Sequence, residues 1–309
     1  MTTTTSPSMP GDGIEIRPMS VHIGAELFGV DLAGELEAAQ VAAIRAALLR
    51  WKVVFFRDQG LDHAGHVRLA RRFGAPTPAH VVFGTNEDHP EVYSVAKHRT
   101  AQNGRAAAMR CWTGWHTDIT AAINPPWASI LRGQTVPPYG GDTHWTNLAL
   151  AYDRLSEPLK RLVEGLRAVH RFDAPRNEDY ARKVGASDLA AEHPLVTVHP
   201  ETGEKVLYVS PAFVKEIVGM EAREGQALLE LLWEHAVSTE FTVRFRWAPG
   251  SIAFWDNRAT AHLAPVDIFA TDFDRQFYRV TLNGEVPVGV DGRPSRLLSG
   301  APIEPQPVS

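Results

Sequence analysis

The sequence has almost no cysteine and no long apolar run. Cys111 is the single cysteine among 309 residues, so the chain cannot form an internal disulfide. No stretch approaches the roughly 20 apolar residues that span a bilayer. The opening residues, MTTTTSPSMPGDG, lack the basic and apolar regions of a secretory signal peptide. Together these features predict a cytoplasmic protein with no membrane segment.

The sequence also lacks an excess of positive charge. Lys and Arg number 31 against 36 Asp and Glu, which gives a formal net charge of −5. Basic and aromatic residues are not interleaved in the pattern of a nucleic-acid-binding surface, so we expect no nucleic acid partner. The hydrophobic fraction of 44% is typical of a globular protein with a substantial core.

Four stretches have the pattern of helices. Apolar residues recur at helical spacing, and two local signals mark helix ends: Asp62 is a plausible N-cap, and Pro158 marks a break or a helix start. The expected helices cover residues 35–50, 62–73, 148–168 and 221–236.

Many short apolar or alternating stretches predict strands. They are two strands within 14–32, then WKVVFFRD, ASILRGQTV, KVLYVS, EFTVRFRW, SIAFWDN and QFYRVTLNG. Their number and irregular spacing favour an all-β sandwich or barrel decorated by helices. We expect a disordered leader at residues 1–13, a single domain at 14–296 and a mobile tail at 297–309. The loop-rich residues 75–110, including much of the segment 84–111, have the composition of a functional lid.

The stretch WHTDIT, residues 115–120, carries two groups that can bind a metal. If it is a strand, His116 and Asp118 point to the same face, because side chains alternate along a strand. An isolated His-x-Asp is more often structural. However, His262 ends the stretch SIAFWDNRATAH, whose apolar run predicts a late strand with WDN as its polar exit, and in a barrel such a late strand can lie beside an early one. Two His and one carboxylate are the ligand set of non-haem Fe(II) oxygenases, and zinc accepts the same set.

The stretch RQFYR places two arginines on one face of a predicted strand. Arg275, Phe277 and Arg279 alternate with residues that face the other side. Two guanidiniums inside a barrel need anionic partners, and their planar fork suits a carboxylate or sulfonate. The alternative is an outward face with solvated arginines.

Taken together, these motifs resemble the taurine dioxygenase family, and within it the alkylsulfatase dioxygenases. The resemblance covers roughly residues 15–290. It is carried by WHTDIT, PPYGGDTHWTN, AYDRLSEPLKRLVEGLRAVH, HPETGEKVLYV, FWDNRATAH and RQFYRVTLNGEVPV. It implies a double-stranded β-helix, a cupin-like jelly roll, that uses Fe(II), 2-oxoglutarate as co-substrate and O₂.

The resemblance also assigns roles to individual positions. It implies that His116, Asp118 and His262 hold the iron. It implies that Arg275 and the Thr143 hydroxyl hold the distal carboxylate of 2-oxoglutarate. An anionic group of the substrate would then meet Arg279, His80 and the backbone N–H of Ile119, and Asn257 and Arg258 could orient the metal ligands.

Two departures from the taurine enzymes bear on the substrate. Trp112 stands where those enzymes have an Asn that contacts the taurine amine, and Phe83 stands where they have a Tyr. Both changes remove polar partners, so a buried ammonium would be poorly served and taurine itself is disfavoured. We therefore expect a small anionic substrate with an apolar body, an alkyl sulfate ester or an alkanesulfonate, cleaved to an aldehyde with release of sulfate or sulfite.

Other functions remain open at this point. The same chemistry could act on a carboxylate, such as an aryloxyalkanoate or a specialised-metabolite intermediate. A non-catalytic, metal-binding cupin has no need of an arginine for a co-substrate. A zinc hydrolase needs a general base near the metal, and the motifs offer no clear candidate. By analogy with the family, we expect a homodimer or homotetramer.

Overall fold

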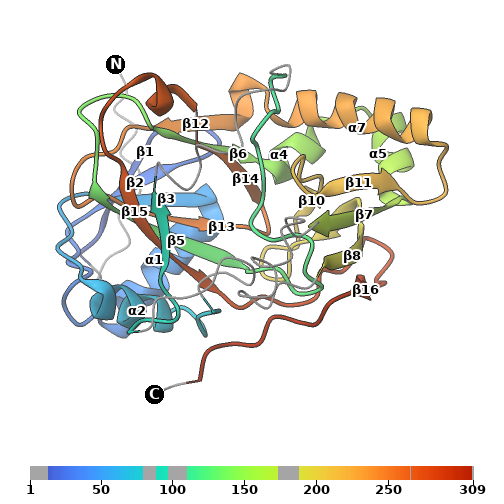
Figure 1. Ribbon diagram of the computed structural model, residues 1–309. Helices are drawn as coiled ribbons and strands as arrows, with labels where there is room; N and C mark the ends of the chain where they lie inside the picture. Colours follow the sequence, from blue (N-terminus) through green and yellow to red (C-terminus); the bar gives the residue numbers. More distant parts are fainter. Residues whose placement is uncertain (1–12, 79–87, 97–109, 173–187, 265, 308–309) are drawn as a thin grey trace, which may run out of the picture.

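The computed structural model describes residues 13–78, 88–96, 110–172, 188–264 and 266–307 (Figure 1). Its helices are α1 (Ala38–Trp51), α2 (His63–Arg71), α4 (Leu148–Asp153), α5 (Glu157–Glu164) and α7 (Ala222–Ala236), with the 3-10 turns η1 (Thr239–Phe241) and η2 (Val266–Ala270). Its strands are β1 (Glu15–Pro18), β2 (Ala25–Phe28), β3 (Val53–Phe56), β4 (Tyr93–Ala96), β5 (Ala128–Thr135), β6 (Thr143–Asn147), β7 (Arg167–Phe172), β8 (Leu189–Pro194), β9 (Val196–Val198), β10 (Lys205–Leu207), β11 (Val214–Ile217), β12 (Thr242–Phe245), β13 (Ile252–Asp256), β14 (Thr260–Leu263), β15 (Gln276–Leu282) and β16 (Arg296–Ser299).

The main sheet has seven strands in the order β1-β2-β3-β13-β5-β15-β4. Its central strands are buried on both faces, which explains their almost continuous apolar sequences. In β3, Val54 and Phe56 pack in the cluster that α1 and α2 share with the sheet. Val53 and Phe55 belong to the cluster on the opposite face. Figure 1 shows α1 and α2, in blue, covering one side of this sheet.

A second sheet, β12-β6-β14, covers the other face of the main sheet. The space between them is filled by aromatic side chains. The Phe55 and Phe245 rings are stacked with centroids 4.1 Å apart, and Trp145 packs edge-on against Phe55 at 5.3 Å. Two sheets that enclose one core are the arrangement of a jelly roll, so the expected all-β core is confirmed.

A third layer extends the molecule beside the two sheets. Strands β11, β7, β8 and β16 form a four-stranded sheet, and β9 pairs with β10. Helices α4, α5 and α7 bury their apolar side chains in a cluster with this part of the chain. Helix α7 runs alongside β11, as Figure 1 shows. This layer supplies residues that pack behind the segment 116–122, as described below.

Most of the expected helices are confirmed. Asp62 caps α2, because its side chain accepts a hydrogen bond from the Gly65 N–H at 2.6 Å. The expected helix at 148–168 is wrong in its extent. It is divided into α4 and α5, with Pro158 in the first turn of α5, and α5 ends at Glu164 before Gly165. Residues from Arg167 onward pair with β8 and β11 instead, because strand pairing overrides the local helical pattern.

The segment expected to be a mobile tail is packed in the structure as far as it is described. Strand β16 pairs with β8, and the backbone of Ile303 exchanges hydrogen bonds with the Asn124 side chain at 2.8 and 3.0 Å. The leader 1–12 and much of the expected lid, 84–87 and 97–109, lie outside the described residues. No helix in the described part of the chain is long and apolar enough to cross a membrane.

Candidate metal and co-substrate site

His116 and His262 are brought together by backbone pairing. His262 lies on β14, and His116 forms an isolated antiparallel bridge with it. The two residues exchange N–H···O=C bonds of 2.9 and 2.7 Å, so their side chains share one face. Their imidazole rings lie with centroids 4.2 Å apart. The prediction that His262 would meet the WHTDIT segment is confirmed, but the strand that carries His262 is β14 and not the predicted strand SIAFWDN, which forms β13.

The route of Asp118 into the site differs from the expectation. Residues 117–122 form turns rather than a strand, and Ile119 has a φ of 48°. The turn is held by Thr117, whose hydroxyl donates to the Thr260 carbonyl and whose N–H donates to Ser210. Asp118 therefore reaches the two histidines because the chain bends around it, not because of strand alternation.

His116, Asp118 and His262, from here on the triad, form a compact set of metal-type donors. Their ligand atoms all lie within 4.8 Å of one another, and His262 Nε2 is 3.9 Å from Asp118 Oδ1. The Nδ1 of His116 lies 3.0 Å from the Gly114 carbonyl, which favours the tautomer that leaves Nε2 free to bind. Two imidazole nitrogens and one carboxylate oxygen fit Fe(II) and leave open positions.

The electrostatics of the site favour ligand-competent protonation states. Burial and the neighbouring His116 lower the pKa of His262 well below its ordinary value, so the ring is neutral. Burial alone would raise the pKa of the Asp118 carboxyl, but the charge of Arg279 and the hydrogen bond from Ser129 lower it below its usual range. The carboxylate is thus ionised although Asp118 is only 2% exposed.

Arg279 lies directly at the metal-binding group. Its Nη1 donates to Asp118 Oδ1 at 2.5 Å, and its side chain is 11% exposed. On β15, Phe277 packs into the aromatic core between the sheets while Val280 packs toward the helices. The expected face with Arg275, Phe277 and Arg279 is confirmed, and the alternative of solvated arginines is wrong for both guanidiniums.

Arg275 lies beside the Gly141–Thr143 segment. It is 8% exposed, and its Nε donates to the Gly141 carbonyl at 3.2 Å. Burial lowers its pKa to about 10, which leaves the guanidinium charged at neutral pH. The neighbouring Asp142 is bonded to Arg244 instead. Among the described residues, no carboxylate forms a hydrogen bond with Arg275. An anionic ligand that did so would stabilise this buried cation.

The hydroxyl of Thr143 accepts one hydrogen bond and keeps a proton that it can donate. The indole N–H of Trp247 donates to Thr143 Oγ1 at 3.0 Å. An indole can only donate, so the Thr143 oxygen acts as acceptor in this bond and its own proton remains available. Thr143 lies two residues after Gly141, whose carbonyl accepts the hydrogen bond from Arg275. A buried hydroxyl donor and a buried guanidinium beside the same short segment suit a carboxylate ligand.

Of the other residues predicted to bind the substrate, two lie in the described part of the chain and two do not. Ile119 follows Asp118 in the turn and packs against the small cluster that contains Phe213. Trp112 is half-buried, with its ring centroid 6.0 Å from that of Trp233 on α7. His80 and Phe83 lie outside the described residues.

Several residues that support the triad gave no sequence signal. The buried His170 and His193 both anchor Thr120, through its hydroxyl at 2.9 Å and its carbonyl at 2.8 Å. Ser129, on β5, donates to the second oxygen of Asp118 at 2.6 Å. Of the two residues expected to orient the ligands, Asn257 bonds to Ser129, whereas Arg258 binds Asp256 and Glu201 instead.

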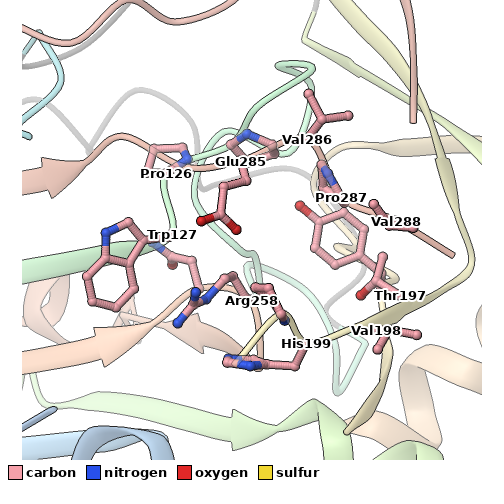
Figure 2. A pocket seen from close by; sticks show the side chains of 14 residues that line it. Pro126, Trp127, Thr197, Val198, His199, Arg258, Glu285, Val286, Pro287 and Val288 are labelled. Atoms are coloured by element: carbon pink, nitrogen blue, oxygen red, sulfur yellow. The ribbon is translucent and has the colours of Figure 1, made fainter. Parts of the chain in front are cut away.

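A cavity of about 380 Å³ is lined by Asn257 and Arg258, but not by the triad. Figure 2 shows Glu285 and Arg258 reaching into the space between Trp127 and the segment 197–199. Asn257 borders this cavity, and its amide donates a hydrogen bond to Ser129, which in turn donates to Asp118. The cavity is therefore distinct from the metal-binding centre.

Comparisons with known proteins agree with the motifs. The family model described as "Taurine catabolism dioxygenase TauD, TfdA family" matches residues 15–281. The chain is 42% identical over 295 residues to an alpha-ketoglutarate-dependent sulfate ester dioxygenase of Pseudomonas putida, covering 92% of this chain and 94% of that protein. It is 37% identical over 303 residues to an alkylsulfatase of Acinetobacter baylyi, covering 94% and 91% respectively. A crystal structure described as a taurine dioxygenase from Burkholderia xenovorans is 62% identical with a TM-score of 0.85, covering 94% of this chain and 96% of that one.

Proposed function

The chain belongs to the TauD/TfdA family of iron(II)- and 2-oxoglutarate-dependent dioxygenases, and from this premise we propose that it oxidises an alkyl sulfate ester or an alkanesulfonate. As a dioxygenase of this family it uses Fe(II), 2-oxoglutarate and O₂. The position of Arg279 at the triad is the observation that supports this choice of substrate.

We assign the iron to the triad. His116 and His262 offer neutral nitrogens, and Asp118 offers an ionised carboxylate within 4.8 Å of them. Bound iron, with 2-oxoglutarate and O₂, supplies the oxidising chemistry, and the co-substrate leaves as succinate and CO₂. The contribution of the protein is to hold these groups in place and to keep water from the reacting centre.

We assign the distal carboxylate of 2-oxoglutarate to Arg275 and Thr143. The Arg275 guanidinium has one hydrogen bond to the Gly141 carbonyl, and the Thr143 hydroxyl proton is free to donate. A carboxylate that accepts hydrogen bonds from both groups would neutralise the buried guanidinium, and such charged hydrogen bonds are stronger in a buried site than in water. Such a contact fixes the distance of the 2-oxo acid from the triad.

We assign the anionic group of the substrate to Arg279. The guanidinium meets Asp118 through Nη1, and among the described residues Nη2 forms no hydrogen bond. A sulfate or sulfonate at that nitrogen would sit next to the metal ligands and bring the adjoining carbon close to the reacting centre. The backbone N–H of Ile119 and the side chain of His80 belong to the same assignment.

The residues that we assign to the substrate favour an apolar body over an ammonium group. Trp112 packs against Trp233 and offers an aromatic surface rather than an amide. Phe83 has no polar group to offer either. The relatives named above include a sulfate ester dioxygenase and an alkylsulfatase, which supports a sulfate ester as the substrate class.

The products follow from simple carbon chemistry. Oxidation replaces a C–H bond by C–OH on the carbon that bears the ester oxygen. The new hydroxyl then loses its proton to water as the C–O bond to sulfate breaks, which gives an aldehyde and inorganic sulfate. An alkanesulfonate oxidised at the carbon bearing sulfur releases sulfite in the same way. No hydrolytic nucleophile is needed in either case.

The test is a substrate panel with the iron-loaded protein, 2-oxoglutarate and O₂. The panel contains alkyl sulfates, alkanesulfonates, taurine and aryloxyalkanoates, and succinate is measured together with sulfate and sulfite. We expect succinate formation to rise with an alkyl sulfate or alkanesulfonate and to be matched by the released sulfur anion. Stimulation by carboxylates alone would overturn the substrate while leaving the reaction class intact.

A carboxylate substrate is the second candidate, because a guanidinium fork binds carboxylate as readily as sulfonate. Two further statements also stay predictions from the sequence: that the enzyme is cytoplasmic, and that it is a homodimer or homotetramer. Light scattering at several protein concentrations measures the assembly directly.

A further inference from the structure

We propose that Asp267 is a positioning residue for 2-oxoglutarate: its carboxylate binds the backbone N–H of Gly141, and the Gly141 carbonyl holds the Arg275 guanidinium in place. The proposal rests on the assignment of the distal carboxylate of 2-oxoglutarate to Arg275. Asp267 lies on η2, in the connection between β14, which carries His262, and β15, which begins directly after Arg275. It therefore belongs to the segment that joins the metal site to the co-substrate site.

The backbone of Gly141 bonds to both the acid and the arginine. Its N–H donates to Asp267 Oδ1 at 3.1 Å, and its carbonyl accepts from Arg275 Nε at 3.2 Å. The Arg275 guanidinium also lies over the Phe277 ring, with Cζ 4.0 Å from the ring centroid. Because the Gly141 carbonyl is the hydrogen-bond acceptor for Arg275 among the described residues, the position of the guanidinium depends on where Gly141 is held.

Two consecutive glycines allow this close approach. Gly140 and Gly141 have φ values of 77° and 67°, in the left-handed region that favours glycine. A Cβ at Gly140 would lie 3.6 Å from Asp267 Oδ2, and a Cβ at Gly141 would lie 3.0 Å from Arg275 Nε. The chain therefore passes close to both the carboxylate and the guanidinium without a side chain of its own, and the groups that bond to its backbone determine its position.

Further contacts hold η2 and the glycine segment against each other. Asp267 itself is exposed, but the next residue, Ile268, is 4% exposed and anchors η2 in the fold. The rings of Tyr139 and Phe273, which belong to the same two segments, meet edge to face with centroids 4.9 Å apart. The bond between Asp267 and the glycine segment is thus part of a packed contact and not an isolated surface pair.

The arrangement places negative charge near Arg275 without occupying its guanidinium. Burial lowers the pKa of Arg275, and the charges of Asp267 and Asp142 oppose this change. Each of the two carboxylates is bonded elsewhere, Asp267 to the Gly141 N–H and Asp142 to Arg244. Neither forms a hydrogen bond with Arg275 within the described part of the chain. The guanidinium therefore keeps its charge and stays available to the carboxylate of the co-substrate.

The experiment measures equilibrium binding of 2-oxoglutarate to the full Fe(II)-loaded chain under anaerobic conditions, with Fe(II) affinity measured in parallel. Asp267→Ala should weaken 2-oxoglutarate binding roughly tenfold, because the charged hydrogen bond that fixes Gly141 is lost. Its Fe(II) affinity should be unchanged. Asp267→Asn should bind 2-oxoglutarate as tightly as the unchanged protein, because an amide oxygen can still accept from the Gly141 N–H. In turnover, Asp267→Ala should raise the KM for 2-oxoglutarate and not the KM for the oxidised substrate.

Asp272→Ala is the matched control, since Asp272 is an exposed carboxylate of the same connection that forms no hydrogen bond with the described residues. Its affinity for 2-oxoglutarate should equal that of the unchanged protein. The proposal is overturned if Asp267→Ala keeps wild-type affinity for 2-oxoglutarate or loses Fe(II) affinity to the same degree. It is also overturned if Asp267→Asn binds as weakly as Asp267→Ala, or if Asp272→Ala is equally weak.

Arg275→Met separates failure of the proposal from failure of the co-substrate assignment. Wild-type affinity for 2-oxoglutarate in Arg275→Met would show that the assignment of the distal carboxylate is wrong, and the proposal would fail with it. Weak binding in Arg275→Met together with wild-type binding in Asp267→Ala would keep the assignment and refute the role of Asp267 alone.

Discussion

Replacing Arg275 by methionine should weaken 2-oxoglutarate binding far more than iron binding. The guanidinium is 8% exposed and charged, with its Nε on the Gly141 carbonyl. A hydrogen bond to a charged group contributes about 1.5–3 kcal/mol. Losing a two-pronged contact of about 3 kcal/mol corresponds to a rise of roughly 100-fold in the dissociation constant for 2-oxoglutarate, at about 1.4 kcal/mol per tenfold.

Two further variants make the same prediction sharper. Arg275→Lys keeps the charge but loses the planar fork, so its effect should be intermediate. Gly141→Ala leaves Arg275 in place but crowds it. A Cβ at position 141 would lie 3.0 Å from Arg275 Nε, and the backbone there has a φ of 67°. Because Arg275 must shift, we expect Gly141→Ala to weaken 2-oxoglutarate binding, although Gly141 itself has no side chain that could contact the ligand.

The assay is equilibrium binding of 2-oxoglutarate to the metal-loaded protein under anaerobic conditions, with metal affinity measured in parallel. Arg246→Met is the control, since Arg246 is exposed and, among the described residues, its side chain bonds only to the Pro138 carbonyl. Unchanged 2-oxoglutarate affinity in Arg275→Met would refute the assignment. An equal loss in Arg246→Met would show that the effect is general charge and not this site.

Three other substitutions test separate parts of the account. Arg279→Met should raise the KM for the anionic substrate roughly tenfold to hundredfold, because one charged hydrogen bond of about 1.5–3 kcal/mol is lost. The KM for 2-oxoglutarate should stay unchanged, and equal changes in both KM values would contradict separate roles for Arg279 and Arg275. Phe55→Ala should lower the free energy of unfolding by about 3–5 kcal/mol in chemical denaturation, because Phe55 is fully buried against Phe245 and Trp145; a loss below about 1 kcal/mol would mean that the aromatic core is loosely packed. Burial lowers the pKa of His66 to about 3 from 6.5, so the unfolded chain takes up a proton below pH 6.5 that the folded chain does not. Stability therefore falls as the pH drops from 6.5 toward 3, and His66→Gln should reduce this slope between pH 6 and 5 by up to about 1.4 kcal/mol per pH unit; an unaltered slope would show that His66 is protonated in the fold.

The strands that carry the site could be predicted from the sequence because their burial is periodic. In RQFYRVTLNG the alternation places Arg275, Phe277 and Arg279 on one face. In the structure the Arg275 guanidinium lies 4.0 Å from the centroid of the Phe277 ring, while Val280 packs in the cluster on the other side of the sheet. The two histidines and the carboxylate were recognisable from residue type and from their order along the chain. Their meeting is confirmed by the His116–His262 bridge.

The bend at Asp118 could not be read in the same way. WHTDIT has residues typical of a strand, yet the segment turns because contacts from distant parts of the chain hold it. Thr117 bonds to Thr260 and Ser210, and Thr120 bonds to His170 and His193. Nothing in six residues indicates partners more than forty positions away, so tertiary contacts decide the local structure.

Ser129 illustrates a second limit. A serine within ASILRGQTV has no feature that distinguishes it from any other strand serine. Its role follows from the register that sets it opposite Trp255, and register depends on pairing between β5 and β13. The hydrogen bond from the Trp255 indole to Asn257, which in turn donates to Ser129, could likewise only be found in three dimensions.

The most direct test of the central claim is equilibrium binding of Fe(II) under anaerobic conditions to the unchanged protein, to Asp118→Ala and to Ser251→Ala. Ser251 serves as the control because it is buried and its hydroxyl bonds to Arg57 and the Ala248 N–H, not to the triad. We predict one tight site per chain in the unchanged protein and in Ser251→Ala, and loss of that site in Asp118→Ala with the fold retained by circular dichroism. Tight binding of one Fe(II) by folded Asp118→Ala would contradict the assignment of the metal to His116, Asp118 and His262.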